Sequence, residues 1–326
     1  MAESERKSMN SETFGDVANR WLSAVSANIK PSTYAGYASV LELHILPQLG
    51  KRSIKRLKEA DINNFTEIKL KNGRADGKGG LSIKTVRDLL SVINTIMDYA
   101  YNETIISNRI TITYPKLENQ SIRILSRQEQ SALEDVLRID LDIHKLGIML
   151  CLYTGLRIGE ICALRWADIS PEFDSLSVRQ TLQRIKDVTG EKGKTKIHID
   201  TPRCERSIRN IPIPRFLTGD LRDFALDGNS YFLSTDNLLF TEPRTMQNHF
   251  ARCVKAANIS GANFHATRHT FAARCIEAGV DVKTLSEMLG HANINMTINR
   301  YVISSFEQKR GEINKLESYT GKCIGL

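Results

Sequence analysis

Apolar side chains recur every three or four positions along most of this chain, and that period restricts its fold more than any other feature. The clearest stretch is residues 83–102, where one side of the pattern carries Val86, Leu89, Leu90, Ile93, Ile96, Met97 and Ala100. The same period occurs in residues 12–27 and 31–50, and a further helix is expected from Asp61. This spacing is typical of helices that bury one face. A mostly α-helical protein is therefore expected.

The helical pattern falls into two blocks, because polar residues and Pro115 interrupt it between them. The expected organisation is an N-terminal tail (1–11), an all-helical domain (12–110), a linker (111–124) and a second domain (125–326). The second domain opens with the capping-box pattern of Ser126 and Glu129. Stretches rich in Ile, Val and Thr at 175–183 and 197–214 predict strands. The second domain is thus expected to be α+β, with a small antiparallel sheet.

Composition excludes two classes of protein. The 326 residues contain no apolar stretch close to the ~20 residues of a membrane span. The six cysteines lie far apart and form no C-x-x-C pair, which argues against a zinc site and against a disulfide framework. The 45 Lys and Arg against 37 Asp and Glu give a net charge of +8, a modest indication of an anionic partner. A protein of the cytoplasm, away from membranes, is expected.

Three short motifs and a tyrosine follow one another in the second half. They are T-G-L-R-I-G-E at 154–160, H-A-T-R-H at 265–269, L-G-H at 289–291, and Tyr301 ten residues after His291. The two histidines of H-A-T-R-H are four residues apart, a spacing that can bind zinc. The segment lacks the Glu of the zinc-protease motif and has no evident third ligand. No metal site and no cofactor are expected.

Taken in this order, the four pieces resemble the tyrosine recombinases, the phage-integrase family of site-specific DNA recombinases. The motif T-G-L-R-I-G-E is similar to the matching motif of integrases from conjugative transposons and prophages. The resemblance implies an enzyme that cleaves and rejoins DNA through a 3′-phosphotyrosine, without metal or ATP, to integrate or excise a mobile element. Two alternatives stay open: DNA relaxation like that of a type IB topoisomerase, and a catalytically weakened DNA-binding regulator of the same fold.

The chemistry accounts for these residue types. Two permanently charged guanidinium groups, Arg157 and Arg268, can hold the phosphate oxygens as negative charge develops. The histidines His265 and His291 can donate hydrogen bonds or carry a proton. The resemblance implies that Tyr301 is the nucleophile, which leaves a free 5′-hydroxyl. Glu160, one turn after Arg157, is expected to orient active-site groups.

One position departs from the family pattern. The family carries a general-acid lysine in a β-hairpin turn, and here the matching stretch T-P-R-C-E-R has Arg203 instead. Arginine is a poor proton donor because its pKa lies above ~12. Either Arg203 acts electrostatically, or a neighbouring lysine (Lys192, Lys194 or Lys196) serves, or the chain is a weakened variant.

The expected partner is double-stranded DNA, held in a C-shaped clamp of the two domains. The candidate phosphate contacts are Lys51, Arg52, Lys55, Arg56, Lys58 and Lys78. The resemblance implies a homotetramer on two paired sites, in association with the nucleoid, and allows a directionality factor as an additional partner. About eleven residues precede the first helix, too few for the arm-binding domain that many such integrases carry, so a naturally short or a truncated form is expected. Residues 304–326 are expected to form an amphipathic helix that packs on a neighbouring protomer or folds back on its own domain.

Overall fold

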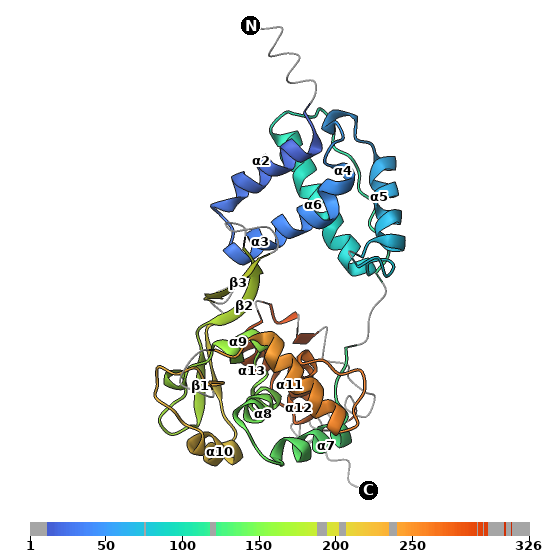
Figure 1. The fold of residues 1–326 in the computed structure, drawn as a ribbon. Helices are drawn as coiled ribbons and strands as arrows, with labels where there is room; N and C mark the ends of the chain where they lie inside the picture. The colour runs from blue at the N-terminus through green and yellow to red at the C-terminus, as the bar shows by residue number, and fades with distance from the viewer. Residues whose placement is uncertain are drawn as a thin grey trace. The chain divides into compact units, whose positions relative to one another are not determined.

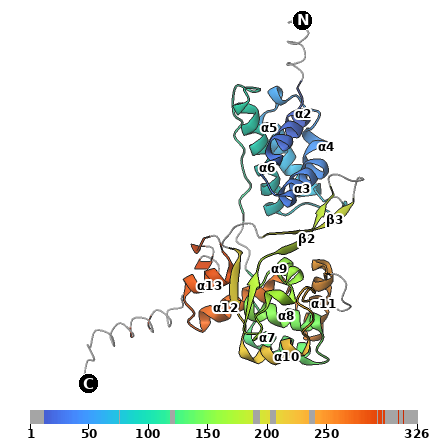
Figure 2. The same cartoon turned by 90° about the vertical axis from the view of Figure 1, so that its left-hand side faces the viewer.

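The computed structural model describes residues 12–74, 76–117, 122–187, 194–201, 207–234 and 240–291, with a few positions beyond (293–295, 297, 298, 310 and 314). The chain forms two compact units, shown in two views in Figures 1 and 2. The first unit contains residues 1–120 together with 184–198. The second contains residues 121–183 and 199–326.

Helices make up nearly all of the first unit's N-terminal part (Figure 1). They are α2 (Phe14–Ser26), α3 (Pro31–Val40), the π-helical turn η1 (Leu41–Ile45), α4 (Leu46–Leu49), the 3₁₀ turn η2 (Ile54–Arg56), α5 (Glu59–Asn72) and α6 (Ile83–Asn102). Every residue that the sequence assigned to the apolar side of α6 is buried. Phe14, Trp21 and Phe65 pack with that face in one hydrophobic core.

The sequence predicts one helix over residues 31–50, and the structure divides it. The α-helical turns of α3 pass into the π-helical turn η1 before α4 resumes at Leu46. Pro47 has no amide hydrogen and cannot donate to the carbonyl four residues before it. Wider turns of this kind commonly accommodate such an interruption.

The second unit is also mainly helical. Its helices are α7 (Arg127–Arg138), α8 (Ile143–Thr154), α9 (Ile158–Ala163), α10 (Thr218–Asp223), α11 (Pro243–Ala256), α12 (His265–Glu277) and α13 (Val282–Leu289), with 3₁₀ turns η3 (Trp166–Asp168) and η5 (Arg215–Leu217). Helix α8 is buried on nearly all sides and contacts α7, α11 and α12. The predicted capping box is present, since Ser126 and Glu129 bond to each other's backbone amides at the start of α7. Because α8 packs against three helices, its C-terminal end firmly supports the residues that follow it.

The strands form two small sheets where the sequence predicts one. Strand β1 (Ser175–Val178) pairs antiparallel with β4 (Arg209–Pro212), so that Ser175 faces Pro212 and Val178 faces Arg209. Strand β2 (Thr181–Lys186) pairs with β3 (Thr195–Asp200). Each predicted strand region thus supplies one strand to each sheet. The outer part of the second pair, Arg184–His198, belongs to the first unit, where Lys186 forms an ion pair with Glu42.

None of the described helices is both long enough and apolar enough to cross a membrane.

Candidate active site

Arg157 lies in the short connection between α8 and α9. Gly155 ends α8 in the left-handed conformation, with φ of 66°, and lets the chain turn toward α9. Arg157 then precedes the first turn of α9, where its amide donates to Glu160 Oε2 at 2.8 Å. Its guanidinium donates to Glu160 Oε1 at 2.7 Å. Glu160 therefore fixes both the backbone and the side chain of Arg157.

Arg268 lies on α12 and is 2% exposed. Its guanidinium donates to the carbonyl oxygen of Gly155 at 2.7 Å and to that of Leu289 at 2.6 Å. The two predicted arginines, 111 positions apart in the sequence, therefore meet through the Gly155 turn. The backbone at the last residue of α13 is the second support of Arg268.

The candidate histidines differ in their surroundings. His265 is the first residue of α12 and is exposed, and its ring lies 4.6 Å from the perpendicular ring of His269. His291 is buried, with Nδ1 2.7 Å from the hydroxyl of Thr297 and its amide donating to the carbonyl of Ser286. Gly290 precedes it in the left-handed conformation that ends α13, with φ of 61°. In the described part of the chain, no three His, Cys, Asp or Glu side chains are grouped as a metal site would require.

Arg209 is not among the residues predicted from the sequence, and it bonds to Glu160 and to the end of α13. Its side chain is 5% exposed and donates two hydrogen bonds to Glu160, at 3.1 Å to Oε1 and 2.9 Å to Oε2. It also donates to the carbonyls of Ser207 and Met288. One signal could have revealed it. Arg209 shares the inward register of β4 with Ile211, a position where an unpaired charge would be costly.

Electrostatics keep Glu160 charged. Burial alone would raise its pKa, but the hydrogen bonds and charge of Arg209, with the charge of Arg157, lower it to about 2. The orienting role that the sequence predicts for Glu160 stays a prediction, and Arg157 is one of the groups that Glu160 contacts. Its principal partner, however, is the strand arginine.

A pocket of about 870 Å³ opens beside this group. Its lining includes Arg209, Ser286 and His291, with Lys283, Glu287 and Asn293. Cationic and hydrogen-bonding side chains at one side of such a pocket suit an anionic group such as a phosphodiester.

Two predicted site residues, Tyr301 and Arg203, lie outside the described residues. Of the alternative lysines, Lys192 also lies outside them. Lys194 and Lys196 are described, at the hairpin of β2 and β3, where Lys196 Nζ lies 3.0 Å from Asp187 Oδ1. Their assignment stays a prediction.

Comparison with known proteins gives the family. The profile described as "Phage integrase family" matches residues 123–308, and that of its N-terminal SAM-like domain matches residues 13–70. The first match spans more than half of the chain and contains all of the motifs. The chain belongs to the phage integrase family.

The relatives of this integrase include recombinases and integrases of mobile elements. A tyrosine recombinase XerC-like protein of Caldanaerobacter subterraneus is 28% identical, with 93% of this chain and 82% of the relative covered. Among solved structures, the integrase of transposon Tn1549 bound to a circular intermediate DNA matches with a TM-score of 0.73, 24% identity and coverage of 92% and 99%. A lambda integrase tetramer bound to a Holliday junction matches with a TM-score of 0.65, 17% identity and coverage of 90% and 78%. The fold of this integrase is therefore that of the tyrosine recombinases.

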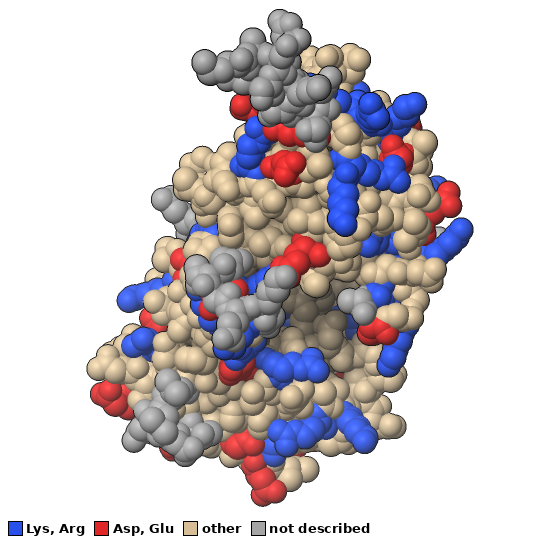
Figure 3. Space-filling view, turned by 45° about the horizontal axis from the view of Figure 1, so that its top comes forward, with Lys and Arg blue, Asp and Glu red and all other residues tan. Residues whose placement is uncertain are grey.

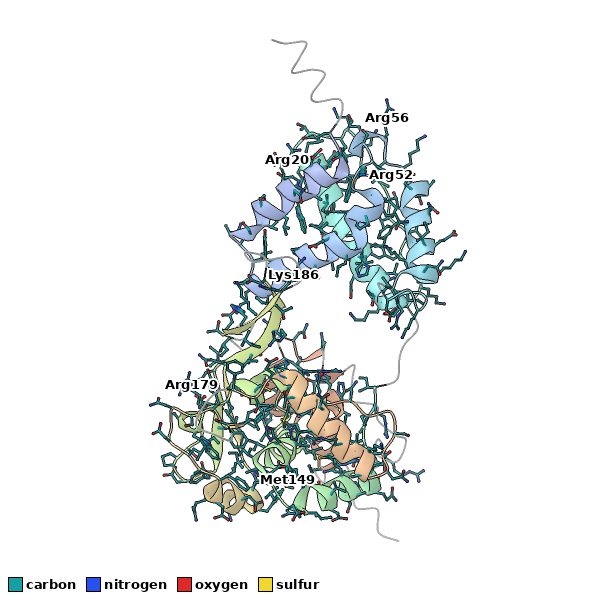
Figure 4. The ribbon with its side chains drawn as sticks, viewed as in Figure 1. Arg20, Arg52, Arg56, Met149, Arg179 and Lys186 are labelled. Carbon is teal, nitrogen blue, oxygen red and sulfur yellow. The ribbon has the colours of Figure 1, made fainter. Side chains whose placement is uncertain are left out.

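The six basic residues predicted to contact DNA are all exposed in the first unit of this integrase. Arg52 forms an ion pair with Asp61, and the neighbouring loop holds an Arg74–Asp76 pair. Figure 4 shows Arg52 and Arg56 at the end of this unit away from Lys186. On the face drawn in Figure 3, Lys and Arg are interspersed with Asp and Glu on both units. The basic residues thus do not form one continuous patch on that face.

Proposed function

We propose that this integrase cleaves and rejoins DNA at specific sites by attack of the Tyr301 hydroxyl on phosphorus. One observation carries the proposal: Arg157 and Arg268, from segments far apart in the sequence, both donate to the backbone of the turn that ends α13. They do so at Gly290 and Leu289, immediately before His291. Two guanidinium groups and a histidine are thereby brought to one place, as a phosphoryl-transfer site needs.

Each residue has one role in the proposed reaction. Arg157 and Arg268 stabilise the charge that develops on the non-bridging oxygens of the pentavalent transition state. His265 and His291 donate hydrogen bonds or accept the tyrosine proton. The new P–O bond to Tyr301 replaces the bond to the 5′-oxygen, and the reverse attack by a 5′-hydroxyl rejoins the strand. Because one phosphodiester replaces another, the reaction needs no nucleotide cofactor.

The nucleophile can be tested on a denaturing gel with a nicked duplex that carries the crossover site. Wild-type protein in EDTA is expected to form a covalent protein–DNA adduct, and Tyr301→Phe is expected to form none. Tyr101→Phe, at an exposed position of α6, is the matched control and keeps the adduct. An adduct that persists in Tyr301→Phe would overturn the assignment, and one that needs a divalent metal would overturn the metal-independent chemistry.

We assign the leaving-group position to Arg203, which would stabilise charge on the 5′-oxygen without donating its proton. Arg203→Lys supplies a side chain that can donate a proton at neutral pH, so its single-turnover cleavage rate is expected to equal or exceed that of wild type. A reduced rate would count against this placement and favour one of the hairpin lysines. Lys194→Ala and Lys196→Ala then identify which one.

We further propose that the enzyme works as a tetramer on two paired double-stranded sites, with a directionality factor as a further partner. The tetramer of lambda integrase on a Holliday junction supports the assembly. In this arrangement residues 12–110 form the core-binding domain, 125–326 the catalytic domain, and the C-terminal segment couples neighbouring protomers. A DNA substrate supports the further proposal that the protein acts in the cytoplasm, in association with the nucleoid. Mass measurement of the complex on paired sites tests this, and a single protomer on a single site as the active species would contradict it.

A further inference from the structure

The pair of Arg209 and Glu160 joins two parts of the second unit that the motifs leave unconnected. Glu160 belongs to α9, and Arg209 is the first residue of β4. Both side chains are at most 5% exposed, and the two guanidinium nitrogens of Arg209 meet the two oxygens of Glu160. A bidentate arginine–carboxylate pair of this kind has one preferred geometry. The strand therefore fixes the orientation of the Glu160 carboxylate.

That carboxylate has a second cationic partner. Glu160 Oε1 accepts from Arg157 at 2.7 Å and from Arg209 at 3.1 Å, so one oxygen lies between two guanidinium groups. Arg157 is 37% exposed along its side chain, whereas Arg209 is almost fully enclosed. The enclosed Arg209 therefore fixes the Glu160 carboxylate, and that carboxylate in turn fixes the solvent-facing Arg157.

The turn that ends α13 links the same arginine to the rest of the site. Three consecutive carbonyls accept from three arginines: Met288 from Arg209 at 2.6 Å, Leu289 from Arg268 at 2.6 Å, and Gly290 from Arg157 at 3.4 Å. The C-terminal end of a helix carries partial negative charge on such carbonyls, so it suits cations. His291 follows directly. The backbone of residues 288–290 thus sets the spacing of all three guanidinium groups.

The packing around Gly290 shows how closely Arg209 fits. A Cβ added at Gly290 would lie 3.1 Å from both Cδ and the first terminal nitrogen of Arg209. The left-handed backbone at this position also favours glycine. The glycine of L-G-H therefore accommodates the Arg209 side chain as well as the turn.

We propose that Arg209 is a positioning residue for DNA cleavage, acting through Glu160 on Arg157 and through the Met288 carbonyl on the turn that holds Arg268 and His291. The proposal rests on the recombinase function given above. Arg209 touches none of the reacting atoms in this role. It sets where the phosphate-binding arginines lie.

The electrostatic consequence can be measured. Removing the Arg209 charge leaves Glu160 buried with Arg157 as the cation that still bonds to it, so the pKa of Glu160 rises from about 2. Among the residues that the structure describes, a further titratable neighbour of Glu160 is Cys151 on α8, whose pKa is raised by burial, by Cys162 and by Glu160, so it stays a neutral thiol. Protonated Glu160 no longer bonds to Arg157 as a charged acceptor. Cleavage by the variant should therefore fall as the pH is lowered, in a range where wild-type Glu160 stays ionised.

The experiment compares Arg209→Met and Arg209→Lys with wild type in single-turnover cleavage of the nicked duplex between pH 5 and 8.5. DNA affinity is measured by fluorescence anisotropy, and folding by thermal unfolding. Arg209→Met is expected to slow cleavage on the order of 10²-fold at pH 7.5 with DNA affinity changed less than about threefold. Its cleavage rate should also fall more steeply toward pH 5 than that of wild type, because Glu160 then titrates in addition to the histidines. Arg209→Lys keeps a charge but loses the bidentate pair, so we expect a loss of about tenfold without the steeper pH dependence.

Arg274→Met is the matched control, because Arg274, on α12, also takes part in a polar network, with Gln130, Glu277 and the Leu125 carbonyl. It is expected to lower the melting temperature without changing the pH profile. A pH profile of Arg209→Met that matches wild type, or a cleavage rate within about threefold of wild type, would overturn the proposal. Should Arg209→Met show no cooperative unfolding, Arg209→Lys decides, and wild-type cleavage by that variant overturns it. Absence of a Tyr301 adduct with the wild-type protein would instead overturn the proposed function.

Discussion

At the residue scale, Gly155 shows how one backbone position can fix a site. Its left-handed φ of 66° ends α8, and its carbonyl accepts from Arg268. A Cβ at this position would lie 2.5 Å from the Phe271 ring and 2.9 Å from the Leu289 side chain. The Phe271 and Leu289 side chains therefore lie close against the turn that carries Arg157.

Gly155→Ala is accordingly expected to destabilise the second unit by about 2–4 kcal/mol, from backbone strain together with overpacking. Gly261→Ala is the control, since Gly261 has nearly the same φ, 67°, with nothing within 4 Å of an added Cβ. It should cost about 1 kcal/mol, from the left-handed conformation alone. Chemical denaturation of both variants gives the two values. Equal losses of unfolding free energy in the two variants would show that the contact with Phe271 adds nothing to the cost of a side chain at residue 155.

Arg209 illustrates why some functional residues escape a sequence pattern. The sequence around Arg209, in a four-residue strand, does not indicate which residue it pairs with, because Glu160 lies 49 positions earlier. Arg157, Arg268, His265 and His291 could be selected as candidates because each lies within a short motif of fixed spacing. Arg209 can be recognised only in the folded protein, where the register of β4 points its side chain inward and Glu160 binds it.

At the element scale, α8 and α11 are joined by a pair of histidines. The rings of His144 and His249 stack at 4.1 Å between centroids and 13° between planes, and His144 Nε2 lies 3.2 Å from the Thr241 hydroxyl. Burial and the charge of the other histidine lower the pKa of His144, and burial and Arg252 lower that of His249. Asp142 acts in the opposite direction on both. The neutral rings are the form that suits this contact.

This contact predicts a loss of stability in mild acid. A histidine with a lowered pKa in the folded state binds protons more readily when unfolded, so stability falls as the pH drops through the unfolded value of about 6.5. The melting temperature of the wild type should therefore decrease between pH 7.5 and pH 5.5. His249→Phe retains a stacking ring without a titrating group and should reduce this decrease. A variant with the same pH dependence as wild type would exclude the pair as its source.

The two small sheets show a limit of strand prediction from composition. The Ile-, Val- and Thr-rich stretches correctly indicated where strands occur, but not which strands pair. Pairing depends on where the chain turns between 178 and 181 and between 200 and 209, and no residue pattern there specified it. The predicted helices were closer to the structure, because their period comes from local geometry.

At the scale of the whole molecule, the distribution of charge bears on how the protein binds DNA. The net charge of +8 is spread over basic residues that are interspersed with acidic ones on the face in view (Figure 3). Phosphate contacts release counterions, so each one contributes to the salt dependence of binding. The predicted contacts in residues 51–58 can therefore be tested one pair at a time.

Replacing Lys55 and Arg56 by Ala should weaken binding to all duplexes similarly and reduce the slope of log K against log salt by about 1.8, for two lost contacts. Lys84→Ala, at the exposed start of α6 where Lys84 pairs with Asp88, should leave the slope unchanged. Titrations between 50 and 200 mM salt (a range of about fourfold) give the slopes. An unchanged slope in the double variant would remove this pair from the DNA interface.

The sequence by itself determined the helical character of the chain and its family, and it predicted the site residues. These properties are encoded in local periodicity and in motifs whose members lie within a few residues of one another. The tertiary structure decided how the motifs meet: three arginines, from the α8–α9 connection, α12 and β4, donate to three successive carbonyls at the end of α13. Because side-chain pairing across distant segments depends on packing and strand register, no spacing in the sequence could have placed Arg209 against Glu160.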